Sequence, residues 1–137
     1  AMLGLGDGGA HVGTICDGSF PTTLLRMWGR DRASGRLPLE HLIQRHCQGT
    51  AQTVGLLDRG VLAPGYRADI NVVDLDGLKI SPPRIIHDLP TGGKRLVQRA
   101  EGYRHTFVAG TEVMTDGTWT GATPGRLVRG PQPAPTA

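Results

Sequence analysis

The sequence predicts an α/β arrangement over its first part, followed by a part built of short β-strands. Three observations lead to this prediction. Residues 1–18 form a short apolar lead and a glycine-rich loop, and apolar residues then recur with helical spacing as far as Val54. After Leu57 the pattern changes to brief β-branched runs separated by turns that contain Pro and Gly.

We expect the first helix to begin directly after the loop, at Ser19. The serine hydroxyl can cap a helix, and Pro21 is tolerated in a first helical turn. Apolar residues fill the next two turns, and the sequence then becomes polar from Gly29 to Arg36. The helix is therefore predicted to fray from Gly29 onward.

A second helix is predicted to start at Pro38. Its apolar or small residues keep the i, i+3, i+4, i+7 spacing over four turns: Leu39, Leu42, Ile43, His46, Cys47, Thr50, Ala51 and Val54. We expect Gly49 to divide this helix into two pieces, because glycine weakens a helix interior. Gly55 stands where a closing cap is expected.

The remaining elements are short strands joined by turns. Segment 68–74 is predicted to be a strand, and segment 78–102 is predicted to be irregular because it is rich in Pro and Gly. Segments 103–109 and 111–114 are expected to pair as strands. Asp116-Gly117 is a hairpin-type turn into one more short strand.

These patterns divide the chain into three parts. Residues 1–57 hold the strand tip, the loop and the helices, and residues 58–120 hold the short strands. Residues 121–137 form an extended tail, which we predict to be disordered after residue 130 because it is Pro-rich and lacks core residues. The strands are too few to close a sheet without partners from elsewhere.

Composition indicates a thin core. Of 137 residues, 38% are hydrophobic and 4% aromatic, and 21 Gly and 10 Pro imply much turn and loop. The chain is therefore expected to be a fragment, or a domain that leans on another part of its protein. The net charge of +3 comes from scattered arginines without interleaved aromatic residues, which argues against nucleic acid as a partner.

The two cysteines and the hydropathy pattern bear on location. Cys16 and Cys47 are too few for a disulfide scaffold and do not form a CxxC metal motif, so reduced thiols and a cytoplasmic location are expected. No run of about 20 apolar residues is present, so we expect no membrane partner.

Asp7 is the first residue that could carry chemistry. It follows an apolar lead and is flanked by glycines, which allow a close approach of backbone or ligand. An Asp beside Gly is often a turn or capping residue. The functional alternative is a carboxylate at the end of a barrel strand, where it could hold a metal-bound water and act as general base. Spacing alone leaves both interpretations open.

His11 lies four residues after Asp7, close enough to share a pocket with it and to contact a substrate. A single loop histidine can equally be a hydrogen-bonding residue. No HxH, HExxH or Cys/His cluster accompanies the pair, so the sequence holds no complete metal site. The other histidines are scattered and are expected to be structural: His41, His46, His87 and His105.

The order of several segments resembles the amidohydrolase superfamily. Residues 5–11 (LGDGGAH) resemble its last-strand motif, and 58–65 (DRGVLAPG) with 68–74 (ADINVVD) resemble its return into a small β-domain. Residues 87–100 (HDLPTGGKRLVQRA) and 120–130 (TGATPGRLVRG) are similar to the D-aminoacylase, or N-acyl-D-amino-acid deacylase, branch.

The resemblance implies a fold and a reaction. The fold is a TIM-like (β/α)8 barrel with a small β-sandwich, and this chain would be the end of the barrel followed by part of the sandwich. The reaction is zinc-dependent hydrolysis of the amide bond of N-acyl-D-amino acids. In that reaction Asp7 matches the aspartate that acts as general base and acid, and it could also be a second or weak metal ligand.

The chain departs from the family pattern in two ways. Gly6 stands where a serine is expected, and the family's HxH, Cys and His zinc ligands are absent from residues 1–137. We therefore expect this chain to be inactive alone and to partner with the rest of its parent polypeptide or with copies of itself. The alternatives are another amidohydrolase reaction, such as cyclic amide hydrolysis, and a non-catalytic β-module that binds a partner through free strand edges.

Overall fold

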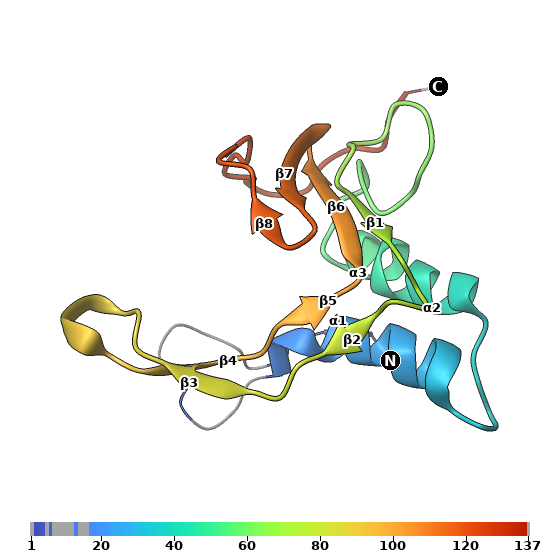
Figure 1. Ribbon diagram of the computed structural model, residues 1–137. Coiled ribbons are helices and arrows are strands. Elements are labelled where there is room, and N and C mark those ends of the chain that lie inside the picture. Colours follow the sequence, from blue (N-terminus) through green and yellow to red (C-terminus); the bar gives the residue numbers. More distant parts are fainter. Residues whose placement is uncertain (1, 5, 7–12, 14–16, 137) are drawn as a thin grey trace.

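The computed structural model spans residues 1–137, and the structure describes all of them except residues 1, 5, 7–12, 14–16 and 137 (Figure 1). Helices come first along the described chain and strands follow. The helical segments are η1 (Asp17–Ser19), α1 (Phe20–Thr23), η2 (Leu24–Asp31), α2 (Leu39–His46) and α3 (Gln48–Thr53). The strands and the last helical turn are β1 (Ile70–Val73), β2 (Lys79–Ile80), β3 (Arg84–Ile86), η3 (Pro90–Gly92), β4 (Arg95–Val97), β5 (Ala100–Glu101), β6 (Tyr103–Val108), β7 (Thr111–Thr115) and β8 (Thr118–Trp119).

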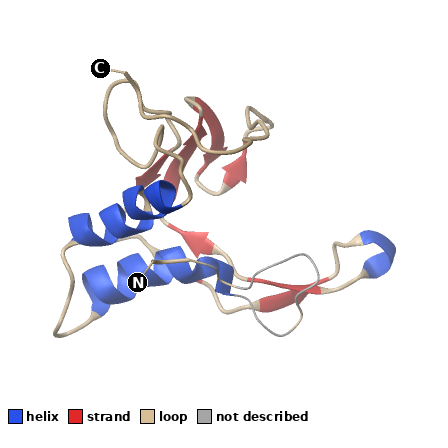
Figure 2. Cartoon of the chain, turned by 180° about the vertical axis from the view of Figure 1, so that it is seen from behind, coloured by secondary structure: helices blue, strands red, loops and turns tan. Residues whose placement is uncertain are grey.

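The first helix extends further than predicted. It runs through α1 into η2, which is wound as a π-helix and ends at Asp31. The prediction that it frays from Gly29 was wrong, because this glycine is a packing contact. A Cβ at Gly29 would lie 3.3 Å from Leu42 Cδ1, so the absence of a side chain lets η2 approach α2 closely. The two helices lie side by side in Figures 1 and 2.

The second helix is broken two residues before Gly49. Its two pieces, α2 and α3, meet at Cys47, which has φ −100° and ψ −73°. The Thr50 hydroxyl donates to the carbonyls of His46 and Cys47, at 2.5 and 3.0 Å, and such back-bonding bends helices. The predicted cap at Gly55 is confirmed, since this glycine has φ +76° just past the helix end.

The predicted hairpins form a four-stranded antiparallel sheet in the order β1-β6-β7-β8. The strand prediction for 68–74 is confirmed by β1, and those for 103–109 and 111–114 are confirmed by β6 and β7. Both connecting turns have positive φ at two successive residues, as type I′ turns require: Ala109 (51°) and Gly110 (79°), and Asp116 (44°) and Gly117 (77°).

The prediction that segment 78–102 is irregular was wrong. This segment forms a long hairpin arm. Strand β2 pairs with β5 and β3 pairs with β4, all antiparallel, and η3 lies at the tip. Asp88 and Arg95 brace the tip through two hydrogen bonds of 2.8 and 2.6 Å. In Figures 1 and 2 the arm extends to one side of the molecule, away from the four-stranded sheet. Strands of two or three residues show too little alternation to be found in a sequence.

The core is as thin as the composition predicts. Within the described residues the core cluster consists of Leu25, Leu42 and Leu78, and the Leu78 side chain is 0% exposed. Partly buried apolar residues pack around it: Leu24, Leu39, Val73, Leu75 and Tyr103. Other large apolar side chains stay exposed, among them Leu62 at 85% and Val54 at 61%.

Polar contacts fasten the first helix to the strands. The Arg30 guanidinium donates to the carbonyls of Leu75, Asp76 and Leu78, with 2.9 Å to Asp76 and 3.0 Å to Leu78. Thr22, which is buried, shares a 2.7 Å hydrogen bond with the Tyr103 hydroxyl. The helices and the strands are therefore joined at the place where the core lies.

The tail after residue 130, predicted to be disordered, lies against the end of α3 in the structure. Gln132 forms a parallel bridge with Leu56, in which its N–H donates to Gly55 O at 2.8 Å and its carbonyl accepts from Leu57 N at 3.0 Å. A Cβ on Gly65 would lie 3.0 Å from Pro135 Cβ. The assignment of the chain to a barrel end and a sandwich, and its division at residues 57 and 120, stay predictions.

Replacing Gly102 should destabilise the fold strongly. This glycine has φ +96°, and a Cβ there would lie 2.8 Å from Leu78 N and 2.9 Å from Leu78 Cα. We expect Gly102→Ala to cost about 3 kcal/mol, from backbone strain and overlap together. Gly117→Ala is the matched control, because its φ is +77° and its Cβ would meet nothing within 4 Å. Urea unfolding should show a loss of only about 1 kcal/mol there, and equal losses would contradict the close contact at Gly102.

Asp74 should make stability depend on acid pH. The Gly77 N–H donates to its Oδ1 at 2.9 Å and Arg104 donates to its Oδ2 at 2.8 Å, and these bonds lower the pKa of the carboxyl. A lowered folded pKa adds stability above the unfolded pKa of about 3.9, and that stability is lost as pH falls through the folded value.

Asp74→Asn should therefore flatten the fall in melting temperature between pH 6 and pH 3. The control Glu40→Gln removes an exposed carboxylate of α2. A curve flattened equally by the control would show that Asp74 has no special part in the acid dependence.

Candidate functional site

The predicted site residues Asp7 and His11 lie outside the described residues. Their roles, including that of Asp7 as a metal ligand, therefore stay predictions. The structure does describe Gly6, which directly precedes Asp7, and η1, which follows the glycine-rich loop.

Both flanks of the loop meet at one cavity of about 380 Å³. It is lined by Gly4, Gly6, Ser19, Phe20, Thr23, Leu24 and Trp28. Because Gly6 and Ser19 line the same hollow, the chain enters the Asp7 segment close to where it leaves it. The glycines on the lead side carry no side chain into the hollow, and a Cβ at Gly4 would meet nothing within 4 Å.

A residue of the hairpin arm binds the Ser19 side chain. Its hydroxyl donates to Gln98 Oε1, and Gln98 Nε2 donates to Ser81 O at 3.0 Å. Ser19 makes no side-chain capping bond to α1, so the cap prediction was wrong. Its hydroxyl instead bonds to Gln98, which lies 79 residues later in the sequence. Sequence patterns gave no role to Gln98, since only the spatial pairing of β2 with β5 brings it to the helix.

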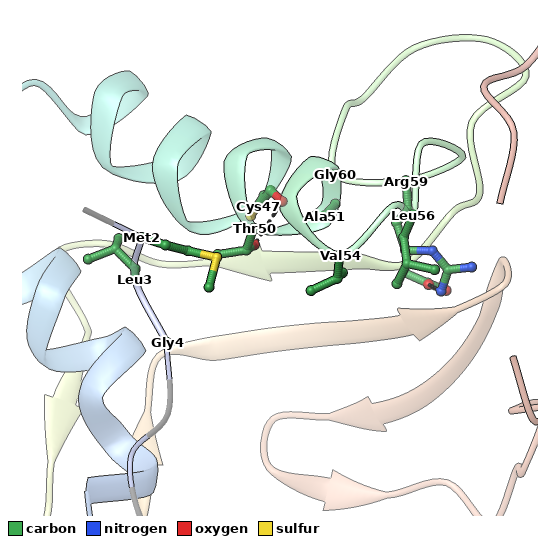
Figure 3. A pocket seen from close by; sticks show the side chains of 11 residues that line it. Met2, Leu3, Gly4, Cys47, Thr50, Ala51, Val54, Leu56, Arg59 and Gly60 are labelled. Carbon is green, nitrogen blue, oxygen red and sulfur yellow. Dashed lines mark hydrogen bonds and ion pairs between the residues drawn. The ribbon is translucent and has the colours of Figure 1, made fainter. Parts of the chain in front are cut away.

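A second cavity of about 450 Å³ lies between the N-terminal lead and α3 (Figure 3). Met2 and Leu3 stand at one end of it, and Leu56 and Arg59 at the other. The lining is mainly aliphatic, and two charged side chains in it, Arg59 and Asp69, are paired with each other at 3.4 Å. Cys47 reaches this cavity, and burial raises the pKa of its thiol, which disfavours the nucleophilic thiolate. The cavity can hold apolar groups.

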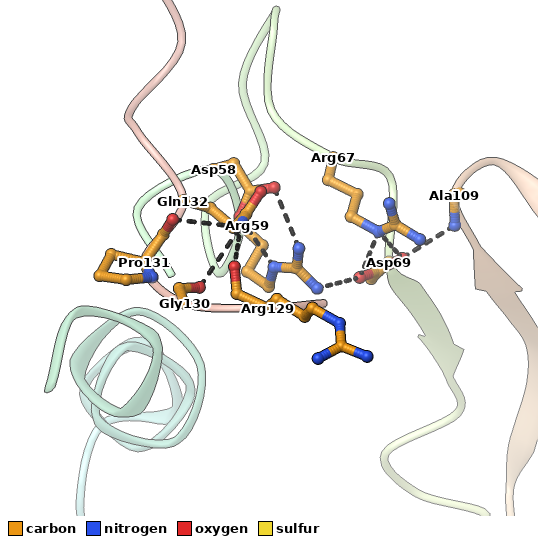
Figure 4. A network of polar contacts seen from close by, with 9 residues as sticks. All are labelled: Asp58, Arg59, Arg67, Asp69, Ala109, Arg129, Gly130, Pro131 and Gln132. Carbon is orange, nitrogen blue, oxygen red and sulfur yellow. Dashed lines mark hydrogen bonds and ion pairs between the residues drawn. The ribbon is translucent and has the colours of Figure 1, made fainter. Parts of the chain in front are cut away.

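An ionic network joins the turn at Asp58 to the four-stranded sheet (Figure 4). Arg59 binds Asp58 at 2.8 Å and Asp69 at 3.4 Å, and Arg67 also binds Asp69, at 3.0 Å. The backbone N–H of Ala109 donates to Asp69 Oδ1 at 2.8 Å. The hydrogen bond from Arg59 lowers the pKa of Asp58, so this carboxyl stays ionised and paired. These carboxylates therefore tie loops together and are not placed to transfer protons.

The described residues do not supply a metal centre. Among them, no group of three or more His, Cys, Asp and Glu side chains is close enough to hold an ion. His46 packs edge-on against Phe20 with 5.6 Å between ring centroids, and burial lowers the pKa of its imidazole. His105 binds Glu112 at 2.6 Å on the β6–β7 hairpin. The donors of the described residues do not fit the zinc that the resemblance implies.

The described part of the chain has no helix long and apolar enough to cross a membrane. Its longest continuous helix, α1 followed by η2, has twelve residues, four in α1 and eight in η2. A membrane-spanning helix needs about 20 apolar residues. The expectation of a cytoplasmic location rests on the cysteines and stays a prediction.

Comparison with known proteins finds curated relatives for half of the chain. Two curated relatives from Desulfitobacterium hafniense, of strains DSM 10664 / DCB-2 and Y51, are both named 5-methylthioadenosine/S-adenosylhomocysteine deaminase. Each is 35% identical over 78 residues, which is 50% of this chain and 18% of the relative. The chain thus spans about a fifth of the length of the curated relatives it matches. No solved structure matches it.

The amidohydrolase family gives a longer match. Its sequence pattern, described as "Amidohydrolase family", matches residues 1–114. The matched stretch takes in Asp7, the Asp58–Asp69 ionic network, the hairpin arm and most of the four-stranded sheet. Since this is more than half of the sequence, the chain belongs to the amidohydrolase family.

Proposed function

We propose that this chain is the C-terminal part of a zinc-dependent amidohydrolase that hydrolyses the amide bond of N-acyl-D-amino acids. The family match over residues 1–114 carries this proposal. Segments 87–100 and 120–130, which resemble the D-aminoacylase branch, favour deacylation within the family. In the parent protein, residues 1–57 would complete a TIM-like barrel, and residues 58–120 would contribute to a small β-sandwich.

Asp7 is the proposed general base. Amide hydrolysis needs a proton taken from water and a proton given to the leaving nitrogen, and one carboxylate can do both in turn. Support for this role comes from the last-strand motif and from the hollow beside Gly6, which leaves space next to the backbone that leads into Asp7. We assign His11, four residues later, to substrate binding.

We place the family's HxH, Cys and His zinc ligands outside residues 1–137, with Asp7 as a second or weak ligand. The sequence contains no HxH, and the described residues hold no cluster of three metal-binding side chains. Bound zinc would supply a water of lowered pKa and polarise the amide carbonyl. This chain's contribution to the reaction is therefore a carboxylate and a wall of the site.

The exposed apolar surface of the described residues supports the proposal that another part of the protein covers it. Large apolar side chains are exposed on the described residues, including Met27 at 52% and Val54 at 61%. The 450 Å³ cavity beside the lead is also mainly aliphatic. Apolar surface of this kind is buried in complete domains. We propose that the rest of the parent polypeptide, or a second copy of it, covers this surface.

The relatives favour a second candidate function, hydrolytic deamination of an adenosine-type compound. Their name, 5-methylthioadenosine/S-adenosylhomocysteine deaminase, describes this reaction, and they are 35% identical to half of this chain. Deamination also adds water at a carbon and expels nitrogen, so Asp7 would keep its role. The intact polypeptide should release D-amino acid from N-acyl-D-amino acids. Ammonia release from 5-methylthioadenosine, without deacylation, would favour the second function.

Asp7→Asn in the intact polypeptide should lower kcat by a factor of about 10² to 10⁴, because amide oxygen cannot accept a proton as a carboxylate does. The Michaelis constant should change little. Asp17→Asn is the matched control, since it neutralises another acid at the end of the same loop. Steady-state kinetics on both variants decides the matter. Equal losses in both would remove the special role of Asp7.

The 137-residue chain should not hydrolyse N-acyl-D-amino acids when zinc is added. It lacks an HxH motif, and a carboxylate alone does not activate water sufficiently. The assay is release of free amino acid with and without a chelator, with the intact polypeptide as positive control. Turnover by the short chain that the chelator abolishes would overturn the proposal that the site is completed elsewhere.

A further inference from the structure

We propose that the hairpin arm, residues 79–101, binds the four-stranded sheet of a second copy of the parent polypeptide. The contact is reciprocal, so each copy supplies one arm and one sheet. The inference goes beyond the proposed function and does not depend on which bond the protein hydrolyses. It gives a role to the arm, none of whose residues belongs to the core cluster of the described side chains.

The arm is a narrow ribbon of two strands. β3 and β4 have three residues each, and β2 and β5 have two. A two-stranded hairpin is at best marginally stable in water unless another surface covers it. Figures 1 and 2 show that the arm runs away from the four-stranded sheet of its own chain. Ile85, which lies opposite Leu96 in the β3–β4 pair, is 52% exposed. The arm therefore offers apolar surface that a partner can cover.

The arm also carries a surplus of positive charge. Residues 79–101 contain five basic and two acidic residues, a net charge of +3, which equals that of the whole chain. Arg95 is paired with Asp88 at 2.6 Å. Arg84, Lys94 and Arg99 are exposed and form no ion pair with the described residues. The arm thus presents cations that its own chain leaves unpaired.

The four-stranded sheet and its turns carry the opposite surplus. Residues 58–78 and 102–120 contain six acidic and three basic residues, a net charge of −3. One arginine there serves two carboxylates, since Arg104 binds Asp74 at 2.8 Å and Asp116 at 3.2 Å. The Asp116 side chain remains 62% exposed. The surplus on the sheet therefore equals that on the arm in size and has the opposite sign.

These charges favour a second copy as the partner. The arm leads away from its own sheet, so it does not neutralise that sheet, whereas a copy related by two-fold symmetry forms the arm–sheet contact twice. In both views the β7–β8 end of the sheet lies on the side to which the arm extends, so one neighbour can meet both. Trp119 on β8 is 61% exposed and offers an aromatic anchor beside Asp116. Two arms laid against each other would repel.

The first test measures the mass of the intact polypeptide by sedimentation velocity over a dilution series. The wild type should be a dimer, and its dissociation constant should rise about tenfold or more between about 50 and 500 mM NaCl, because salt screens exposed charges. The arm variant, Arg84→Glu with Arg99→Glu, should raise this constant about a hundredfold, since like charges then meet. The matched control, Arg126→Glu with Arg129→Glu, makes the same change of charge on exposed tail residues and should leave the constant within about twofold.

The second test reverses the charge of the sheet and then mixes variants. The sheet variant, Asp116→Lys with Thr118→Lys, changes two exposed residues and should weaken the dimer as the arm variant does. In a mixture of the arm and sheet variants, the reversed arm meets the reversed sheet and the ordinary arm meets the ordinary sheet. A one-to-one dimer should therefore form again, although neither variant dimerises alone.

Three results overturn the inference: a monomeric wild type, a dimer that the arm variant does not weaken, and a mixture that stays monomeric. In a monomeric wild type, resistance of Lys94 to trypsin would assign the arm to the rest of its own polypeptide.

If a variant fails to fold, cross-linking of the wild type replaces it. A carbodiimide joins lysines to carboxylates, and it should link a peptide that contains Lys94 to one that contains Asp116 between two copies. Absence of that link in the dimer overturns the inference. These measurements follow mass and not hydrolysis, so their failure leaves the proposed function in place.

Discussion

The helices and the strands are held in one body by the close approach of the Gly102 backbone to Leu78. A methyl group at Gly102 would lie 2.8 Å from Leu78 N, so no other residue leaves room for this crossing. Leu78 is fully buried there against Leu25 and Leu42 from the two helices. Arg30 binds the carbonyls of the turn that carries Leu78. In a chain with so few buried side chains, this crossing supplies much of the tertiary order.

The arginines contribute to the fold mainly through guanidinium groups that bind acidic side chains. All but two of the 15 basic residues are arginines, and three of them show the pattern clearly. Arg59 joins Asp58 to Asp69, Arg95 binds Asp88 at the arm tip, and Arg104 joins Asp74 to Asp116. The planar guanidinium can bind two acceptors at once, which a lysine cannot do with the same geometry. These positive charges thus tie loops to one another.

Local patterns predicted the parts of the fold that local chemistry determines. The type I′ turns at Ala109-Gly110 and Asp116-Gly117, the strand after Asp69 and the cap at Gly55 all depend on a few neighbouring residues. Features set by distant partners could not be found this way. Gly29 continues a helix because Leu42, from the second helix, packs on it.

In the candidate site, too, local sequence identifies one residue and misses another. Asp7 could be singled out because glycines and an apolar lead surround it, and the family pattern then gave it a role. Gln98 could not be singled out, since nothing in its own neighbourhood distinguishes it from a surface glutamine. Its partner Ser19 is 79 residues away, and only the pairing of the arm strands brings the two together.

Because contacting residues lie far apart in the sequence, some contacts form only late in translation. Thr22 leaves the ribosome 81 residues ahead of Tyr103, which is about 4 to 16 s of translation at about 5–20 residues per second. During that interval the first helix lacks the strands against which Leu25 packs. The β6–β7 hairpin, by contrast, can close within about 1–10 μs once both strands are made. In the nascent chain the first helix can therefore pack against α2 well before the strands that complete its core emerge.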